Sequence, residues 1–280
     1  MQCCAISDAH NDFLTNEKCD LPKLNDEFEK NNVVLCNAIL FSNDASPLNF
    51  SLAKQLRNRV NDNLYLKKSC IFSFENIGFV KKVQPLLDFA PFSCSLTWNY
   101  DNKFAGGAFG FSGLTTKGQN LVKVLNENKT LIDTAHLNRR SFWDVVKLIK
   151  HPIFNSHTCV SAFKEHRRNI DIEQVKAIFE SKGFLGITFV QEFFSNKKRT
   201  TYVDIFYIID AIVQAFGCES IGLGSDFYGT TNLPHKLKNY NDFCNLYKCF
   251  KNAGYKESDI EKIFYKNFVN FVKTQKSNCI

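Results

Sequence analysis

The sequence has few of the segments that mark linkers, membrane spans or export signals. It contains only 6 Pro and 13 Gly in 280 residues, with no Gly/Ser/Pro-rich linker and no break in composition, so we expect one domain over residues 1–280. No apolar segment approaches the roughly 20 residues that a membrane span requires. The first residues lack the basic region of a signal peptide, so the expected location is the cytoplasm.

The charge and cysteine patterns exclude two further classes of protein. The net charge of +7 comes from scattered Lys and Arg, densest at Lys197-Lys198-Arg199, and no RNA-binding or helix-turn-helix motif accompanies it. We therefore expect no nucleic-acid partner. The 11 Cys form no paired C-x-x-C knuckle. Cys36, Cys70 and Cys94 lie in apolar runs, where a reduced thiol packs as a small hydrophobe.

Short apolar runs alternate with longer amphipathic ones along the chain. This alternation predicts eight parallel strands with crossovers, the α/β fold of a (β/α)8 TIM barrel with C-terminal helices packed on its outside from Asn239 to Lys273. The expected strands are Cys3–Asp8, Val33–Phe41, Cys70–Phe74, Pro91–Thr97, Thr130–Ala135, Pro152–Ser156, Phe184–Phe189 and Ser220–Ser225. The clearest helices are Ser51–Leu66, Lys117–Leu125, Arg140–Ile149, Ile172–Glu180 and Val203–Phe216, and the expected N-caps are Thr115 or Thr116 and Asp171.

Ionisable residues follow several of these strands, where a barrel of this kind carries its chemistry. They are His10 and Asp12, Glu75, Asp133 and His136, His157, and Asp226. Any one of them alone reads as an ordinary polar residue after a buried strand. Together, imidazole and carboxylate groups without thiolate favour zinc or a similar divalent ion in a hydrolytic site. Cys159 could also reach a metal, but packing is the preferred interpretation.

Eight short blocks of this sequence resemble, in order and approximate spacing, the renal (membrane) dipeptidase family of the amidohydrolase superfamily, in its soluble bacterial form. The resemblance extends from about Asp8 to Gly229. The blocks are His10-Asn11-Asp12, Ser73-Phe74-Glu75, Leu96-Thr97-Trp98-Asn99, Gly113-Leu114-Thr115 with Gly118, Ile132-Asp133-Thr134-Ala135-His136, Asn155-Ser156-His157, His166-Arg167-Arg168-Asn169 and Gly222-Leu223-Gly224-Ser225-Asp226-Phe227.

The resemblance implies a zinc dipeptidase with two metal ions at the mouth of the barrel. In this family pattern His10 and Asp12 match ligands of the first ion, Glu75 matches the bridging carboxylate, and His136 and His157 match ligands of the second ion. Asp226 matches the aspartate that sits by the first ion and moves protons. Arg168 matches the residue that takes the C-terminal carboxylate of the substrate; without the family pattern it reads as a surface arginine in a basic turn.

Two positions depart from the family pattern. Trp98 stands where renal members have a histidine that holds the substrate carbonyl, so it either donates a hydrogen bond through its indole or forms only a pocket wall. Tyr228 stands where the family often has an acidic residue. The loop Ala105–Gly113 is rich in Gly and Phe, which suits either a lid or a simple connection.

The function expected from the residues and the resemblance is hydrolysis of a dipeptide-sized substrate by metal-activated water. Two alternatives stay open: hydrolysis of another small amide or a lactone, and an inactive relative that binds a ligand. Retention of the metal-ligand positions argues against the inactive relative. We expect a small dipeptide-like partner and no membrane; the resemblance allows a homodimer, although the sequence shows no self-complementary face.

Overall fold

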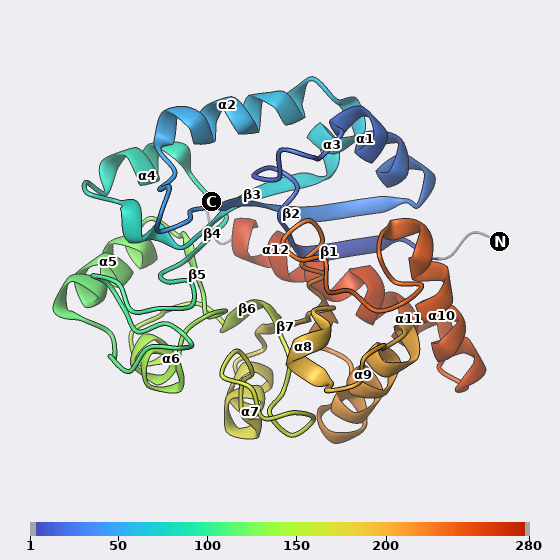
Figure 1. Cartoon of the computed structure of the whole chain (residues 1–280). Helices are drawn as coiled ribbons and strands as arrows, with labels where there is room; N and C mark the ends of the chain where they lie inside the picture. Colours follow the sequence, from blue (N-terminus) through green and yellow to red (C-terminus); the bar gives the residue numbers. More distant parts are fainter. Residues whose placement is uncertain (1–3, 278–280) are drawn as a thin grey trace.

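Eight strands form one parallel sheet, in the order β1 to β8, that rolls into a nearly closed barrel (Figure 1). The computed structural model describes residues 4–277. The strands are β1 (Ile6–Asn11), β2 (Val33–Phe41), β3 (Cys70–Glu75), β4 (Ser93–Ser95), β5 (Leu131–Asp133), β6 (Phe154–Thr158), β7 (Phe184–Ile187) and β8 (Ile221–Leu223). The predicted (β/α)8 barrel is confirmed; Cys3, the first residue of the first predicted strand, lies outside the described residues.

Helices surround the strands on the outside of the barrel (Figure 1). Thr115 caps α5 by accepting the Gly118 N–H at 3.0 Å, and Asp171 forms a capping box at α7, as predicted. The helices are α1 (Leu21–Lys30), α2 (Phe50–Asn61), α3 (Leu64–Ser69), α4 (Gln84–Phe89), α5 (Thr116–Glu127), α6 (Arg139–Val146), α7 (Ile172–Glu180), α8 (Gln191–Phe194), α9 (Tyr202–Phe216), α10 (Phe243–Asn252), α11 (Glu257–Glu261) and α12 (Asn267–Ser277). Three short helical turns are η1 (Ile77–Phe79), η2 (Tyr240–Asp242) and the π-helix η3 (Lys262–Lys266). Within residues 4–277, no helix combines the length and the apolarity needed to cross a membrane.

The helix predicted over Ser51–Leu66 is in fact two helices, α2 and α3. The break falls at Asn63. Its backbone N–H donates to the carbonyl of Val60 at 3.0 Å, and its side-chain amide donates to the backbone carbonyl of Arg59 at 3.1 Å. The second helix starts afresh because the side-chain oxygen of Asn25 accepts the N–H groups of its first turn. The prediction of one continuous helix was therefore wrong.

The barrel closes between β1 and β8 only near the carboxyl ends of these strands. There the Asp226 N–H donates to the carbonyl of His10 at 3.1 Å, and the Asp12 N–H donates to the carbonyl of Phe227 at 2.9 Å. These two hydrogen bonds cross the seam at the residues that the sequence analysis selected. The seam therefore fixes the end of the first strand against the segment that follows the last strand.

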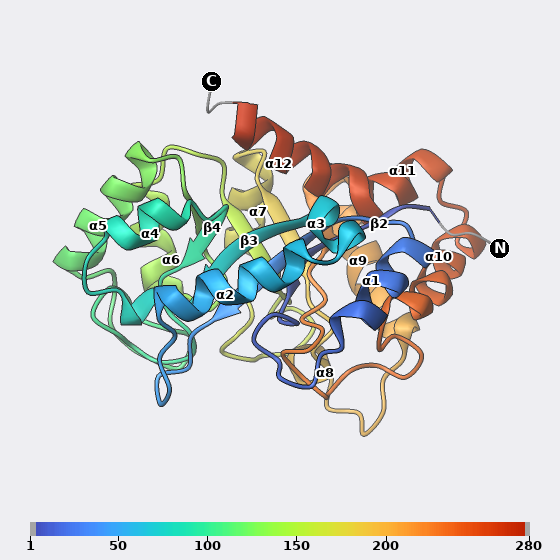
Figure 2. The same ribbon diagram turned by 90° about the horizontal axis from the view of Figure 1, so that it is seen from above.

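The C-terminal helix α12 lies across the opposite end of the barrel (Figure 2). Its Phe268 and Phe271 rings stack on Phe154 at the start of β6 and pack against Phe184 at the start of β7. The C-terminal segment was predicted on the outside, and α10 does pack there against α9. The last helix differs because Phe268 and Phe271 are buried in the apolar cluster at the barrel end, with Phe154 and Phe184.

Candidate metal centre

The structure brings together all six residues predicted as metal ligands, at the mouth of the barrel. His10 and His157 lie near the ends of β1 and β6, and Glu75 is the last residue of β3. The remaining three, Asp12, His136 and Asp226, occupy the turns that follow β1, β5 and β8. A cavity of about 220 Å3 opens over them.

Glu75 occupies the middle of this cluster, and its two oxygens face different histidines. Its Oε2 atom lies 3.6 Å from Nε2 of His10, and its Oε1 atom lies 2.6 Å from Nε2 of His136 and 3.9 Å from Nε2 of His157. On the far side of His10, Nε2 is 3.2 Å from Oδ2 of Asp12. A carboxylate placed in this way can serve two cations at once.

Two of the turns hold their side chains in a strained backbone conformation. His136 has φ of 66° and Asp226 has φ of 61°, in the left-handed region that non-glycine residues seldom adopt. Tyr228, two residues after Asp226, also lies in this region, with φ of 68°. Such strain costs about 1–3 kcal/mol per residue and concentrates at functional sites, where the surrounding structure enforces it.

A second layer of hydrogen bonds orients the three histidine rings. The Ser156 hydroxyl lies 3.2 Å from Nδ1 of His10 and 2.8 Å from Nδ1 of His157, and the Asn99 side-chain oxygen lies 3.1 Å from Nδ1 of His136. Every ring therefore presents Nε2 to the cluster. Groups that hold the outer nitrogen in this way fix the orientation of ligand histidines.

Burial and neighbouring charges set the protonation of the histidines. Burial lowers the pKa of His136 to about 4, reinforced by the charge of Arg168, and burial also holds the pKa of His157 well below its ordinary value. His10 behaves differently, because the charges of Asp12 and Glu75 outweigh its burial and raise its pKa well above the ordinary value. The His136 and His157 rings are therefore neutral at pH 7, the form that coordinates a metal.

The carboxylates crowd together on the β1–β8 side of the cluster. Burial, followed by the charge of Asp12, raises the pKa of Asp226 well above its ordinary value, and burial also raises the pKa of Asp12. Gly229 packs against this pair so closely that a Cβ atom there would lie 2.2 Å from Oδ1 of Asp226 and 2.5 Å from Oδ2 of Asp12. Two carboxylates confined in this way share a proton or require a cation.

The donor set fits a divalent metal. Ligand atoms of His10, Glu75 and His157 lie within 4.8 Å of one another, as do those of His10, Asp12 and Asp226. Within residues 4–277, neither Nε2 of His10 nor Oε1 of Glu75 has a partner in hydrogen-bonding geometry, although both are buried. Buried polar atoms seldom stay unpaired unless a ligand or ion completes the site. Imidazole nitrogen with carboxylate oxygen is the donor set of zinc.

Arg168 lies under the same cavity and is only 4% exposed, so the alternative of a surface arginine is wrong. Its Nη2 donates to the carbonyl of His157 at 3.0 Å, and its guanidinium lies over the ring of Phe193 at 5.5 Å. Within the described part of the chain, its buried Nε has no hydrogen-bond partner. Burial lowers its pKa to about 10, which leaves it charged at pH 7.

Trp98, together with Phe41 and Phe109, lines the cavity with aromatic surface. The Trp98 ring meets Phe41 at a centroid distance of 5.4 Å and His136 at 6.3 Å. Phe109 belongs to the Gly- and Phe-rich loop, so this loop contributes a wall of the cavity. These contacts place Trp98 beside the ligand cluster and leave both of its predicted roles open.

Two other residues near the strand ends serve the framework. Asp133 accepts the N–H groups of Ala135 and Ser156, both at 3.0 Å, and so ties β5 to β6. Cys159 is fully buried in the hydrophobic core, as the packing interpretation predicts.

Sequence reasoning missed Asp8, a buried carboxylate that braces the β1–β8 seam. Its Oδ1 accepts the N–H groups of His10 at 3.2 Å and Ser225 at 2.9 Å, and its Oδ2 accepts the hydroxyls of Ser225 at 2.5 Å and Tyr240 at 2.7 Å. Its position two residues before His10 is the one signal in the sequence, but its other partners, Ser225 and Tyr240, come from more than 200 residues away.

Comparison with known proteins identifies the family. Residues 92–278 match the family described as Membrane dipeptidase (Peptidase family M19). An uncharacterized protein in the pqqA 5'region of Klebsiella pneumoniae is 30% identical over 188 residues, which are 63% of this chain and 69% of that protein. An uncharacterized dipeptidase of Schizosaccharomyces pombe is 28% identical over 160 residues, 54% of this chain and 38% of the yeast protein.

The fold likeness extends over the whole barrel, including β1 to β3, which lie outside the family match. A metallo peptidase from Rhodobacter sphaeroides superimposes with a TM-score of 0.83 at 18% identity, covering 97% of this chain and 99% of that one. Because the family match takes in well over half of the chain, the protein belongs to the membrane dipeptidase family, peptidase family M19, and is a metallohydrolase of that family.

Proposed function

We propose that the protein is a zinc-dependent dipeptidase that hydrolyses the amide bond of dipeptide-sized substrates. The observation that carries this proposal is the convergence of five buried or half-buried donors around Glu75, beside the cavity that the charged Arg168 lines. One zinc ion would be held by His10, Asp12 and Asp226, a second by His136 and His157, and Glu75 would serve both.

The residues at the mouth would have separate roles in amide hydrolysis. Bound zinc supplies a water molecule whose pKa falls to about 7, and it polarises a carbonyl. The Asp226 carboxylate would accept the proton of the attacking water and pass it to the leaving amine. The strained backbone of Asp226 keeps that carboxylate against Asp12.

Arg168 would bind the C-terminal carboxylate of the substrate. Its buried Nε, which has no hydrogen-bond partner within residues 4–277, would donate to a carboxylate oxygen, and the guanidinium charge would favour that carboxylate. Burial strengthens such a pair because little water competes for it. A cavity of about 220 Å3 suits a small substrate such as a dipeptide.

A solved relative supports the same substrate size. The Rhodobacter sphaeroides metallo peptidase is described as liganded with a phosphinate mimic of the dipeptide L-Ala-D-Ala. At 18% identity the likeness in itself concerns the fold. The proposal for this chain therefore depends on its own Arg168 and on the donors around Glu75.

Elemental analysis combined with a dipeptide panel tests this function. Protein purified without chelator should carry two zinc ions per chain and hydrolyse small dipeptides, and chelation should remove both properties. His157→Ala should lose metal and turnover, whereas His235→Ala, outside the cavity, should keep both. Two ions without dipeptide turnover would point to another small amide or a lactone, and absence of metal would refute the site.

A further inference from the structure

One wall of the mouth cavity is a continuous series of residues that leads from Arg168 to the rim. The Arg168 guanidinium covers the ring of Phe193, and the Phe193 ring packs on His166 at a centroid distance of 4.8 Å. Phe109 meets the His166 ring from another side at 6.0 Å. Glu192, the neighbour of Phe193 in α8, also lines the cavity.

Glu192 is the one carboxylate lining this cavity, among the described residues, that does not belong to the proposed metal cluster. Its side chain is exposed, and within residues 4–277 it forms no ion pair. Lys164 holds the backbone at this point, because its Nζ donates to the carbonyls of Glu192 at 2.6 Å and Ser195 at 3.1 Å. The backbone that carries the carboxylate is thus fixed while the carboxylate itself stays available.

The aromatic part of this wall carries no positive charge of its own. Burial lowers the pKa of His166. The negative charge of Glu192 opposes this shift and the positive charges of Lys164 and Arg168 add to it, so the ring is neutral at pH 7. The backbone N–H of Arg168 donates to Nδ1 of His166 at 3.2 Å, which places the ring proton on Nε2. A side chain lying along Phe193 and His166 would meet apolar ring surface and, at the rim, the Glu192 carboxylate, which forms no ion pair within residues 4–277.

A substrate carboxylate on Arg168 brings the side chain of the C-terminal residue next to this wall. We propose that Glu192 is a specificity-determining residue that selects dipeptides with a cationic side chain, lysine or arginine, at the C-terminal position. This inference rests on the proposed dipeptidase function. The methylene groups of that side chain lie against Phe193 and His166, and its charged end meets the Glu192 carboxylate.

Three matched dipeptides of alanine with lysine, norleucine or glutamate at the C-terminal position test this assignment, each with the second residue in either configuration. Norleucine has nearly the shape of lysine without its charge. The zinc-loaded wild type should have a kcat/KM for the lysine peptide about 2- to 5-fold above that for norleucine, and the glutamate peptide should be the poorest substrate. The preference should shrink in high salt, because the pair lies at an exposed rim.

Substitution of Glu192 separates the charge from the shape of the wall. Glu192→Gln should bring the lysine peptide down to the norleucine value and leave norleucine within twofold, and Glu192→Lys should reverse the order in favour of glutamate. The control Glu165→Gln removes an exposed carboxylate that does not line the cavity, and it should keep the wild-type ratios.

The two proposals fail in different ways. Turnover of the norleucine peptide with no lysine preference, or with a preference that Glu192→Gln leaves intact, overturns the role of Glu192 and leaves the dipeptidase standing. If zinc-loaded protein hydrolyses none of the three peptides, the proposed function fails and the role of Glu192 fails with it.

Discussion

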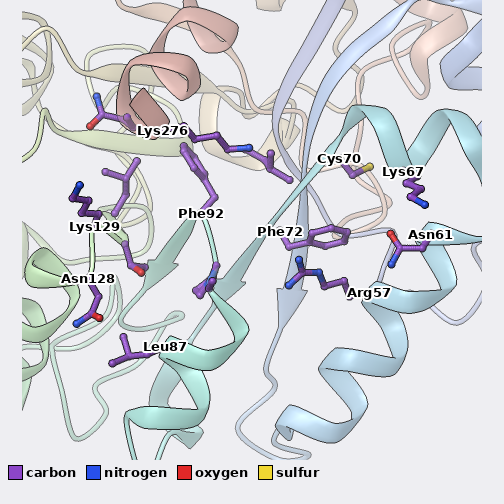
Figure 3. A pocket seen from close by; sticks show the side chains of 16 residues that line it. Arg57, Asn61, Lys67, Cys70, Phe72, Leu87, Phe92, Asn128, Lys129 and Lys276 are labelled. Carbon is purple, nitrogen blue, oxygen red and sulfur yellow. The ribbon is translucent and has the colours of Figure 1, made fainter. Parts of the chain in front are cut away.

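The two ends of the barrel each contain a cavity, and the larger one is at the end without the ligand cluster. That cavity, of about 520 Å3, lies where β3 and β5 begin (Figure 3). Among residues 4–277 its ionisable lining residues include Arg57, Lys67, Lys129 and Lys276, and none of its lining residues is acidic. The mouth cavity has less than half this volume, yet it holds four carboxylates, three histidines and a buried arginine.

The two cavities differ in how their ionisable groups are held. At the larger cavity, Arg57 lies over the ring of Phe72 (Figure 3). Arg57 also donates to the carbonyl of Phe89 at 2.9 Å and lies over the ring of that residue. At the mouth, buried Nε2 of His10 and Oε1 of Glu75 lie close to other ligand residues but form no hydrogen bond of regular geometry within residues 4–277. Desolvated groups without partners are costly, so they mark a site better than volume does.

Of the substitutions that distinguish the two cavities, Glu75→Gln should have the largest effect on turnover and metal content. An amide carries no charge and offers one acceptor oxygen, so it cannot serve two cations as a carboxylate does. We expect kcat/KM for a dipeptide to fall on the order of a thousandfold and metal content to fall with it. Elemental analysis and steady-state kinetics on the same preparation measure both effects.

The matched controls for this substitution lie on the surface and at the other end of the barrel. Glu29→Gln removes an exposed carboxylate, and the double variant Lys129→Ala with Lys276→Ala removes two cations from the larger cavity. Both should keep full turnover and metal content. A large loss of turnover in the double variant would place the chemistry at the wrong end of the barrel.

Gly229→Ala should have the next largest effect, because the added methyl group has no room beside Asp12 and Asp226. Separation of the two carboxylates should weaken metal binding about 10- to 100-fold, as loss of a supporting contact does in other metal sites, with little change in Tm. Gly113→Ala is the control, since its Cβ would meet only the flexible ends of Arg140 and Asp144. Equal metal affinity in the two variants would contradict the prediction.

The framework of the barrel was largely predictable from the sequence, because the relevant signals are local. Buried strands appear as short apolar runs, and β2 and α7 have the predicted bounds. The helices α1, α4 and α8 were missed. In α1 the buried residues are only Leu21, Leu24 and Phe28 among polar neighbours, and α8 is only four residues long. Such patterns become helices because the rest of the barrel buries them.

The ligand residues of the candidate site were predictable because histidines and carboxylates follow the strands. The residues that support them were not, because the sequence does not show which way each side chain points. All six predicted ligands meet at the mouth, and their roles stay predictions, as do the homodimer and the cytoplasmic location. Asp8, Ser156 and Glu192 were missed because strand alternation does not tell which distant groups complete their hydrogen bonds or face the same cavity.

Asp8→Ala should cost stability at the mouth, about 3 kcal/mol, because it leaves four buried donors without an acceptor. Asp8→Asn should cost only about 1 kcal/mol, since the hydroxyls of Ser225 and Tyr240 can turn to accept from the amide. Urea denaturation of the metal-free proteins measures the free energy of unfolding. An Asn variant as unstable as the Ala variant would show that the charge of Asp8, rather than its acceptors, holds the seam.

The smallest effect is expected at the opposite end of the barrel, from His151. Its Nε2 accepts the N–H of Ile132 at 3.2 Å and its Nδ1 donates to the carbonyl of Pro152 at 2.8 Å, so the folded protein needs the neutral ring. Burial lowers its pKa below the ordinary value of 6.5. The unfolded chain therefore takes up a proton first as the pH falls, and the stability that His151 contributes above pH 6.5 is lost as the pH drops through the folded pKa. The glutamine side chain of the variant His151→Gln does not titrate. The variant should be less stable than the wild type by roughly 1 kcal/mol at pH 7.5, with the gap in the free energy of unfolding closing towards pH 5, while metal content and turnover stay unchanged. A gap that is constant from pH 7.5 to pH 5 would mean that His151 does not titrate on unfolding. A loss of metal would mean that the two ends of the barrel are coupled.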